Sequence, residues 1–134
     1  MLNALAYKQL DPHTLFQWMN ERNDFYLIDT LGRDHFRRAH LPRALNACVF
    51  EVSFVDQIKV LVAEKDLVIV LYGSSARSMD ASKAVEKLDR EGYHHLYILD
   101  GGMEAWRDSG KPVESLPDMP PPEVAVEDVA PKAV

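Results

Sequence analysis

The residues best placed to do chemistry lie in the loop that follows the apolar run Leu67–Tyr72. In chain order they are Gly73, Ser74, Ser75, Ala76, Arg77 and Ser78. A buried strand that ends in a short turn before a helix directs successive backbone N–H groups, and the positive end of the helix dipole, toward one point. Arg77 adds a permanent charge that suits oxyanions. The loop therefore predicts an anion-binding site, and its simpler interpretation is a structural turn in which Ser78 caps the helix.

Two further side chains could take part in such a site. Cys48 is the one cysteine of the sequence, so an internal disulfide and a thiolate-rich zinc site are excluded. It could accept sulfur near a strand end, or it is a small buried side chain. Asp29 ends the apolar segment 25–30; it could orient Arg77, or it bonds backbone N–H groups nearby. We expect no metal and no cofactor.

The elements that must position these residues alternate along the chain. Strands are predicted at 25–30, 43–50, 67–72 and 94–100. Helices are predicted at 10–20, 32–40, 53–64, 78–92 and 101–110. This alternation is typical of an α/β fold in which helices cover both faces of a parallel sheet. Ligands bind such sheets beyond the carboxyl ends of the strands, where Asp29, the end of the Cys48 strand and the loop 73–78 should meet.

The composition sets limits on the class of protein. The 134 residues are 47% hydrophobic and 27% charged, which fits one globular domain. A net charge of −6 argues against non-specific binding to nucleic acid or to an anionic membrane surface. The first ten residues lack the pattern of a signal peptide, and no apolar run approaches the length of a membrane span. We therefore expect a soluble, cytoplasmic protein.

Two charged regions lie outside the loop. Residues 117–134 hold five of the eight prolines and four acidic residues against one lysine, which predicts a disordered tail after a domain at 1–116. A basic cluster lies in one short region beside the presumed site; its members are Arg33, Arg37, Arg38 and Arg43. The cluster could dock an acidic protein partner, or the acidic tail could fold over it. Its simpler interpretation is a solvated helical face.

The chain resembles the rhodanese homology domain over roughly residues 7–114. The segment "LIDTLGRDHFRRAHLPRALN" is similar to the first signature of that family, although Arg43 stands where the family usually has glycine. The segment "YILDGGMEAWRDSGKPVE" matches the second signature almost residue for residue. The resemblance implies a three-layer α/β/α fold with a central parallel sheet of about five strands.

The resemblance also implies what is missing. Sulfurtransferases of the family carry a cysteine directly after the central strand, and its thiolate accepts a sulfane sulfur as a persulfide. Here the matching position holds Gly73 or, in the other alignment, Tyr72. The serine hydroxyls cannot replace a thiolate, because they do not ionise near neutral pH without a general base.

We therefore expect a catalytically inactive rhodanese-like domain that serves as an anion-binding or regulatory interaction module. The alternative is an active thiosulfate or persulfide sulfurtransferase that uses Cys48 as a displaced sulfur acceptor. A third possibility is an interaction domain in which the loop plays no part. If the loop still has the shape of the family's site, a Gly73→Cys exchange should regain some sulfur transfer.

Overall fold

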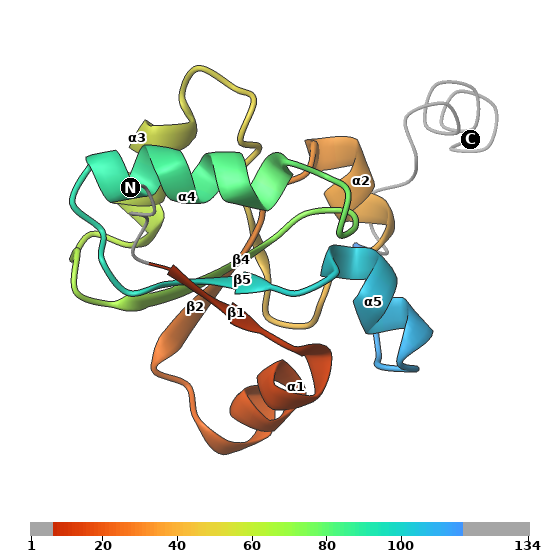
Figure 1. The fold of residues 1–134 in the computed structure, drawn as a ribbon. Coiled ribbons are helices and arrows are strands. Elements are labelled where there is room, and N and C mark those ends of the chain that lie inside the picture. Colours follow the sequence, from red (N-terminus) through yellow and green to blue (C-terminus); the bar gives the residue numbers. More distant parts are fainter. Residues whose placement is uncertain (1–6, 117–134) are drawn as a thin grey trace, which may run out of the picture.

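Five parallel strands form the centre of the structure, a computed structural model that describes residues 7–116 (Figure 1). In chain order the elements are β1 (Tyr7–Leu10), α1 (Pro12–Glu21), β2 (Phe25–Asp29), α2 (Arg33–Arg38), β3 (Leu45–Asn46), α3 (Phe54–Leu61), β4 (Val68–Tyr72), α4 (Asp80–Arg90), β5 (Leu96–Leu99) and α5 (Gly102–Asp108). The strand order is β1-β5-β4-β2-β3. The expected α/β fold with a parallel sheet of about five strands is confirmed.

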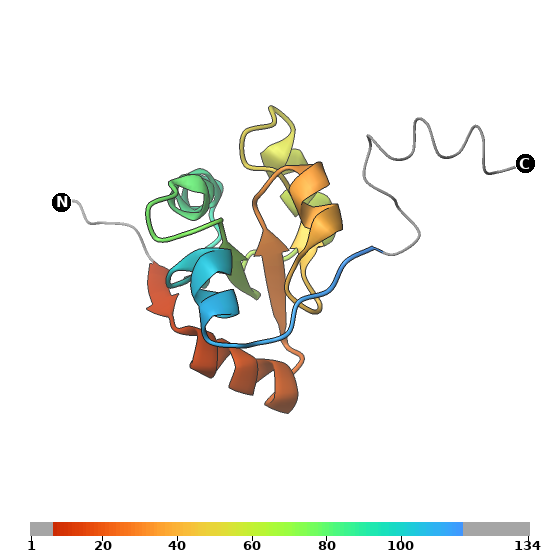
Figure 2. The ribbon, with the colours of Figure 1, turned by 90° about the vertical axis from the view of Figure 1, so that its right-hand side faces the viewer.

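Helices cover both faces of the sheet and create two apolar cores. Residues of α3 and α4 pack on one face, where Ile58 and Leu88 are fully buried. Residues of α1 and α5 pack on the other, where Leu15 and Trp106 are fully buried. Successive residues of β4 alternate between the two cores, as the geometry of a strand requires. The two layers of helices are seen edge-on in Figure 2.

Local sequence signals account for the start of α1 and the end of α4. Asp11 caps α1, since its Oδ1 accepts a hydrogen bond from Thr14 N at 2.7 Å, and Pro12 occupies the first helical turn. Beyond the end of α4, Gly92 adopts a φ of +96°, a left-handed conformation that suits glycine and ends a helix.

Two strand predictions needed correction. The strand expected at 43–50 is only the two-residue β3, because the chain turns at residues 49–50 toward α3. The opposite edge of the sheet is formed by β1, which the apolar pattern did not reveal because Lys8 and Gln9 are exposed. The tail expected at 117–134 lies outside the described residues.

Candidate functional site

The loop Gly73–Ser78 leaves the buried carboxyl end of β4 as a compact turn. Ser78 N donates to Ser75 O at 3.1 Å, and Arg77 N donates to Ser75 Oγ at 3.3 Å. Ser78 Oγ accepts from Asp80 N at 3.1 Å, so it binds the N–H of the first residue of α4. The structural interpretation of Ser78, as a side chain that serves the helix start, therefore has direct support in this bond.

The turn after β5 is docked onto this loop. Met103 N donates to Gly73 O, and Glu104 N donates to Ser74 O, both at 2.9 Å. Gly102 has a φ of +60°, and a Cβ placed there would lie 2.5 Å from Gly73 O. The contact is so close that no side chain fits between the two turns. Two N–H groups at the start of α5 are thus satisfied by loop carbonyls and do not face a ligand.

A hollow of about 170 Å³ opens between the two turns and the start of α4. The polar side chains that line it belong to Gln9, Ser75, Ser78, Ser82 and Asp100. The lining contains no lysine, arginine or histidine, so its one ionisable side chain is a carboxyl group. Arg77 is exposed and does not line the hollow. An anion within the hollow would therefore meet no basic side chain of its lining.

Asp29 belongs to a buried hydrogen-bond network at the ends of β2 and β4. Its Oδ2 accepts from Tyr72 Oη at 2.6 Å, and its Oδ1 accepts from Leu31 N at 2.8 Å. Tyr72 Oη in turn accepts from Leu41 N at 3.0 Å. Of the two interpretations of Asp29, the structure thus favours the one in which it bonds an N–H group nearby, and it shows no bond from Asp29 to Arg77.

Burial dominates the electrostatics of this network. It raises the pKa of Asp29 above the ordinary 3.8, although the bonds from Tyr72 and Leu31 partly offset the effect. Burial, together with the neighbouring Asp29 carboxylate, also raises the pKa of Tyr72. The Tyr72 hydroxyl therefore stays protonated and donates permanently to Asp29. No local pattern indicates this role of Tyr72 beyond its place at the end of an apolar run.

Cys48 is not brought to the loop. Ala47 N donates to Asp29 O and Val49 N to Thr30 O, so the chain around Cys48 runs beside the end of β2. Because β2 separates β3 from β4 in the sheet, Cys48 follows a strand that is not adjacent to the strand leading into the loop. Cys48 is half-buried and does not line the hollow. The side chain is therefore less buried than its interpretation as a small buried side chain predicts.

The space around Gly73 decides whether Gly73→Cys can regain sulfur transfer as expected. Gly73 is buried, and a Cβ built there would lie 3.0 Å from Asp80 Cβ and 3.2 Å from Ser78 Oγ. Its backbone does not adopt a positive φ, so the obstacle is crowding. A thiol at this position would be pressed against the start of α4. The structure argues against a simple recovery of sulfur transfer by Gly73→Cys.

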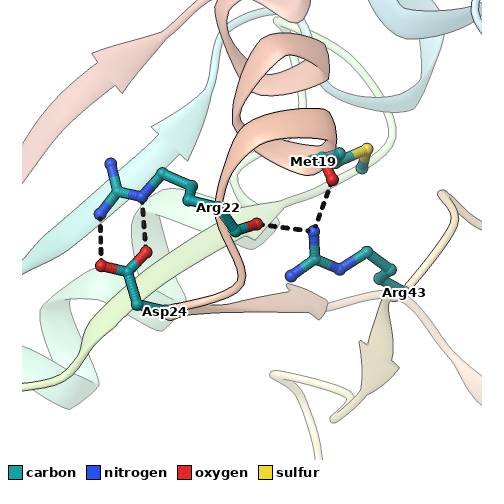
Figure 3. A network of polar contacts seen from close by, with 4 residues as sticks. All are labelled: Met19, Arg22, Asp24 and Arg43. Carbon is teal, nitrogen blue, oxygen red and sulfur yellow. Dashed lines mark hydrogen bonds and ion pairs between the residues drawn. The ribbon is translucent and has the colours of Figure 1, made fainter.

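The basic cluster is divided by the fold. Arg43 adopts a φ of +73°, and its Nη1 donates to Met19 O at 3.0 Å and to Arg22 O at 3.1 Å (Figure 3). Its guanidinium also lies 4.7 Å from the centre of the Phe25 ring. Arg43 therefore satisfies carbonyls at the end of α1, while the other three arginines remain together on α2.

Among residues 7–116, no cluster of three or more histidine, cysteine or acidic side chains could hold a metal ion. Across the same residues, no helix has the length and apolar character needed to cross a membrane.

This fold is shared with known proteins. The profile of a family described as "Rhodanese-like domain" matches residues 11–109. "Thiosulfate sulfurtransferase GlpE" of Vibrio cholerae is 30% identical over 103 residues, which are 74% of this chain and 88% of that protein. The "HTH-type transcriptional regulator Rv0324" of Mycobacterium tuberculosis is 30% identical over 94 residues, which are 70% of this chain but only 39% of the regulator.

Solved structures agree with the sequence comparisons. The crystal structure of the Alr3790 protein from Anabaena sp. superposes with a TM-score of 0.72 at 27% identity, covering 81% of this chain and 82% of that one. This chain belongs to the rhodanese-like domain family. Since Cys48 is its one cysteine, it is a variant that lacks the usual cysteine of the loop.

Proposed function

We propose that this chain is a rhodanese-like domain that does not transfer sulfur and instead binds a small anion at the loop Gly73–Ser78 without reacting with it. One observation carries the proposal: the loop holds no thiol, and the one cysteine of the chain lies beyond β2. The framework around the loop is retained, because the turn after β5 still docks on it through two backbone hydrogen bonds.

The chemistry of sulfur transfer supports the proposal that the chain is inactive as a sulfurtransferase. The acceptor must be a thiolate, which is the nucleophilic form of cysteine. Ser75 and Ser78 present hydroxyl groups at the hollow, but its lining contains no histidine or lysine that could act as a general base. A serine also forms no stable counterpart of a persulfide. The loop therefore retains polar groups that can hold an oxyanion and lacks the group that would react with it.

Backbone N–H groups support the binding part of the proposal. The N–H groups of Ser74, Ser75 and Ala76 find no acceptor among residues 7–116. Successive free N–H groups in a turn are a common way to hold an anion. Arg77 follows directly, is exposed, and forms no ion pair with the described residues. The neighbouring carboxyl of Asp100 acts against the binding of an anion.

The proposal that the chain does not transfer sulfur is tested by measuring turnover of thiosulfate with cyanide as the acceptor. The Vibrio cholerae relative is the positive control. We expect the chain to give the rate of the protein-free blank, and Cys48→Ala to give the same rate. Turnover that disappears in Cys48→Ala would overturn the proposal and establish the alternative, a sulfurtransferase that uses Cys48 as a displaced acceptor.

Titration with sulfate tests the binding part. Arg77→Ala should weaken the affinity about two- to fivefold, the range for an exposed charge contact of 0.5–1 kcal/mol. Asp100→Asn should strengthen it modestly, because a repelling carboxylate is removed. The matched control is Arg90→Ala, which removes an exposed arginine at the far end of α4. Equal affinity in Arg77→Ala and Arg90→Ala would remove the loop from the account.

A further inference from the structure

The second surface with a specific chemical character is the cationic face of α2. The helix is only six residues long, yet it carries Arg33, Arg37 and Arg38 against the single acidic residue Asp34. Arg33 and Arg38 are exposed and take part in no ion pair with the described part of the chain. With Arg43 engaged at α1, these three arginines are the docking candidates that remain.

Arg37 shows that the positive charge is only partly compensated. Its Nη1 lies 3.3 Å from Asp34 Oδ1, and its side chain retains 22% exposure. Its Nε is buried and meets no acceptor among residues 7–116. The helix therefore carries three guanidinium groups and one exposed carboxylate, which pairs with Arg37.

The end of the described chain is fixed against this same helix. His40 and Glu114 exchange two backbone hydrogen bonds of 2.8 Å in an antiparallel bridge, and Leu116 N donates to Arg37 O at 3.1 Å. Both ribbon views show this segment ending beside α2 (Figures 1 and 2). The described chain thus ends next to the arginines of α2.

The sequence that follows has the complementary charge. Four acidic residues and no basic residue lie between positions 117 and 128. The twelve residues after Leu116 span at most about 40 Å when extended, whereas α2 is about 9 Å long. The acids are therefore within easy reach of the helix, and a short tether gives them an effective concentration near the millimolar range.

We propose that the acidic segment 118–128 of this chain docks in cis on the cationic face of α2. Individual exposed ion pairs are weak, so the docking depends on several acids that share three arginines and on the tether at Leu116. It covers the surface that an acidic partner would otherwise use. Because these contacts are screened by salt, the docked state is favoured at low ionic strength.

Paramagnetic relaxation in the full chain tests this proposal. The chain carries Cys48→Ala and a spin label on Ala130→Cys, two residues beyond the acids. A tail that is only tethered broadens amides near Leu116 whatever its charge, so the decisive comparison is between charge variants. We expect the paramagnetic relaxation rates of the backbone amides of residues 33–38 to fall at least about twofold in Arg33→Glu/Arg38→Glu. The same fall is expected for the unsubstituted pair in about 0.5 M salt.

Two further variants make the result specific. Glu127→Lys/Asp128→Lys leaves the folded domain untouched and should give the same fall, and combining it with the arginine reversal should restore the broadening. The matched control Arg90→Glu/Arg107→Glu reverses two exposed arginines on α4 and α5 and should change nothing.

Three results would overturn the proposal. The first is broadening over α2 that is equal in all variants. The second is a fall of the same size in the Arg90→Glu/Arg107→Glu control. The third is broadening that appears only between mixed labelled and unlabelled chains, which would assign the surface to a second copy.

Discussion

The loop after β4 and the turn after β5 touch each other but have kept different parts of the family pattern. The turn after β5 keeps Asp100, Gly101 and Gly102 of the second signature, and its N–H groups bond the carbonyls of the neighbouring loop. The loop after β4 keeps the shape of a turn but has no cysteine. The turn after β5 is thus the complete region, since it keeps its signature residues. The loop after β4 is the deficient region, since it lacks the cysteine, although the two regions are in direct contact.

The difference separates the residues needed for packing from those needed for reaction. Gly102 is required because a side chain would collide with the backbone of Gly73, whether or not the loop reacts. Gly101 is required for a similar reason, since a Cβ there would lie 2.4 Å from Ala105 Cβ. Retention of the glycine signature therefore shows that the fold is intact and carries no information about sulfur chemistry.

The largest expected loss of stability comes from a substitution in the turn after β5, the complete region. Gly102→Ala should destabilise the protein by about 3 kcal/mol or more, because it adds a backbone clash to a left-handed φ. Gly110→Ala is the matched control: Gly110 has a φ of +76° but nothing within 4 Å of the added Cβ. It should cost only about 1–2 kcal/mol. Urea unfolding measures both, and equal costs would contradict the packing role of Gly102.

A smaller loss of stability is expected from a substitution in the loop after β4, the deficient region. Gly73→Cys should destabilise the protein by about 1–3 kcal/mol through crowding against Asp80 and Ser78, and it should show no turnover of thiosulfate. Ser74→Cys places a thiol at an exposed position of the same loop and should change stability by about 0.5 kcal/mol or less. A stable Gly73→Cys protein with turnover would show that the loop has kept room for the lost side chain.

The smallest effect concerns Asp29, which lies where both strand ends meet. Its pKa is raised in the folded state, so the stabilisation it contributes is complete below its ordinary pKa of 3.8. That contribution is lost as the pH rises through the folded pKa. The stability advantage of the wild type over Asp29→Asn should therefore narrow from acid to neutral pH. Urea unfolding at a series of pH values measures the difference, and parallel curves for the two proteins would contradict the assignment.

Much of the fold could be predicted because apolar runs and helical periodicities are local. The core strands β2, β4 and β5 and all five helices were visible in this way. The edge strand β1 was not, because Lys8 and Gln9 leave it without an apolar run. The predicted strand 43–50 was too long, since Ala47 and Val49 are buried in a chain that is already leaving the sheet.

The site was predicted in its position but not in its contacts. The loop 73–78 and Asp29 do lie at the carboxyl ends of β4 and β2, as parallel topology requires. The link between Tyr72 and Asp29 depends on pairing across 43 positions of sequence, which no local pattern contains. The engagement of Arg43 with α1 likewise follows from its left-handed backbone, for which the only hint was the glycine that usually stands there in the family.

The central claim is that the loop has lost its sulfur acceptor while keeping its framework. Intact mass spectrometry of the full chain after incubation with thiosulfate tests it most directly, with Cys48→Ala measured in parallel. We expect that neither the full chain nor Cys48→Ala gains the mass of a sulfur atom. A stable gain of one sulfur per chain that is absent from Cys48→Ala would contradict it and make Cys48 the acceptor.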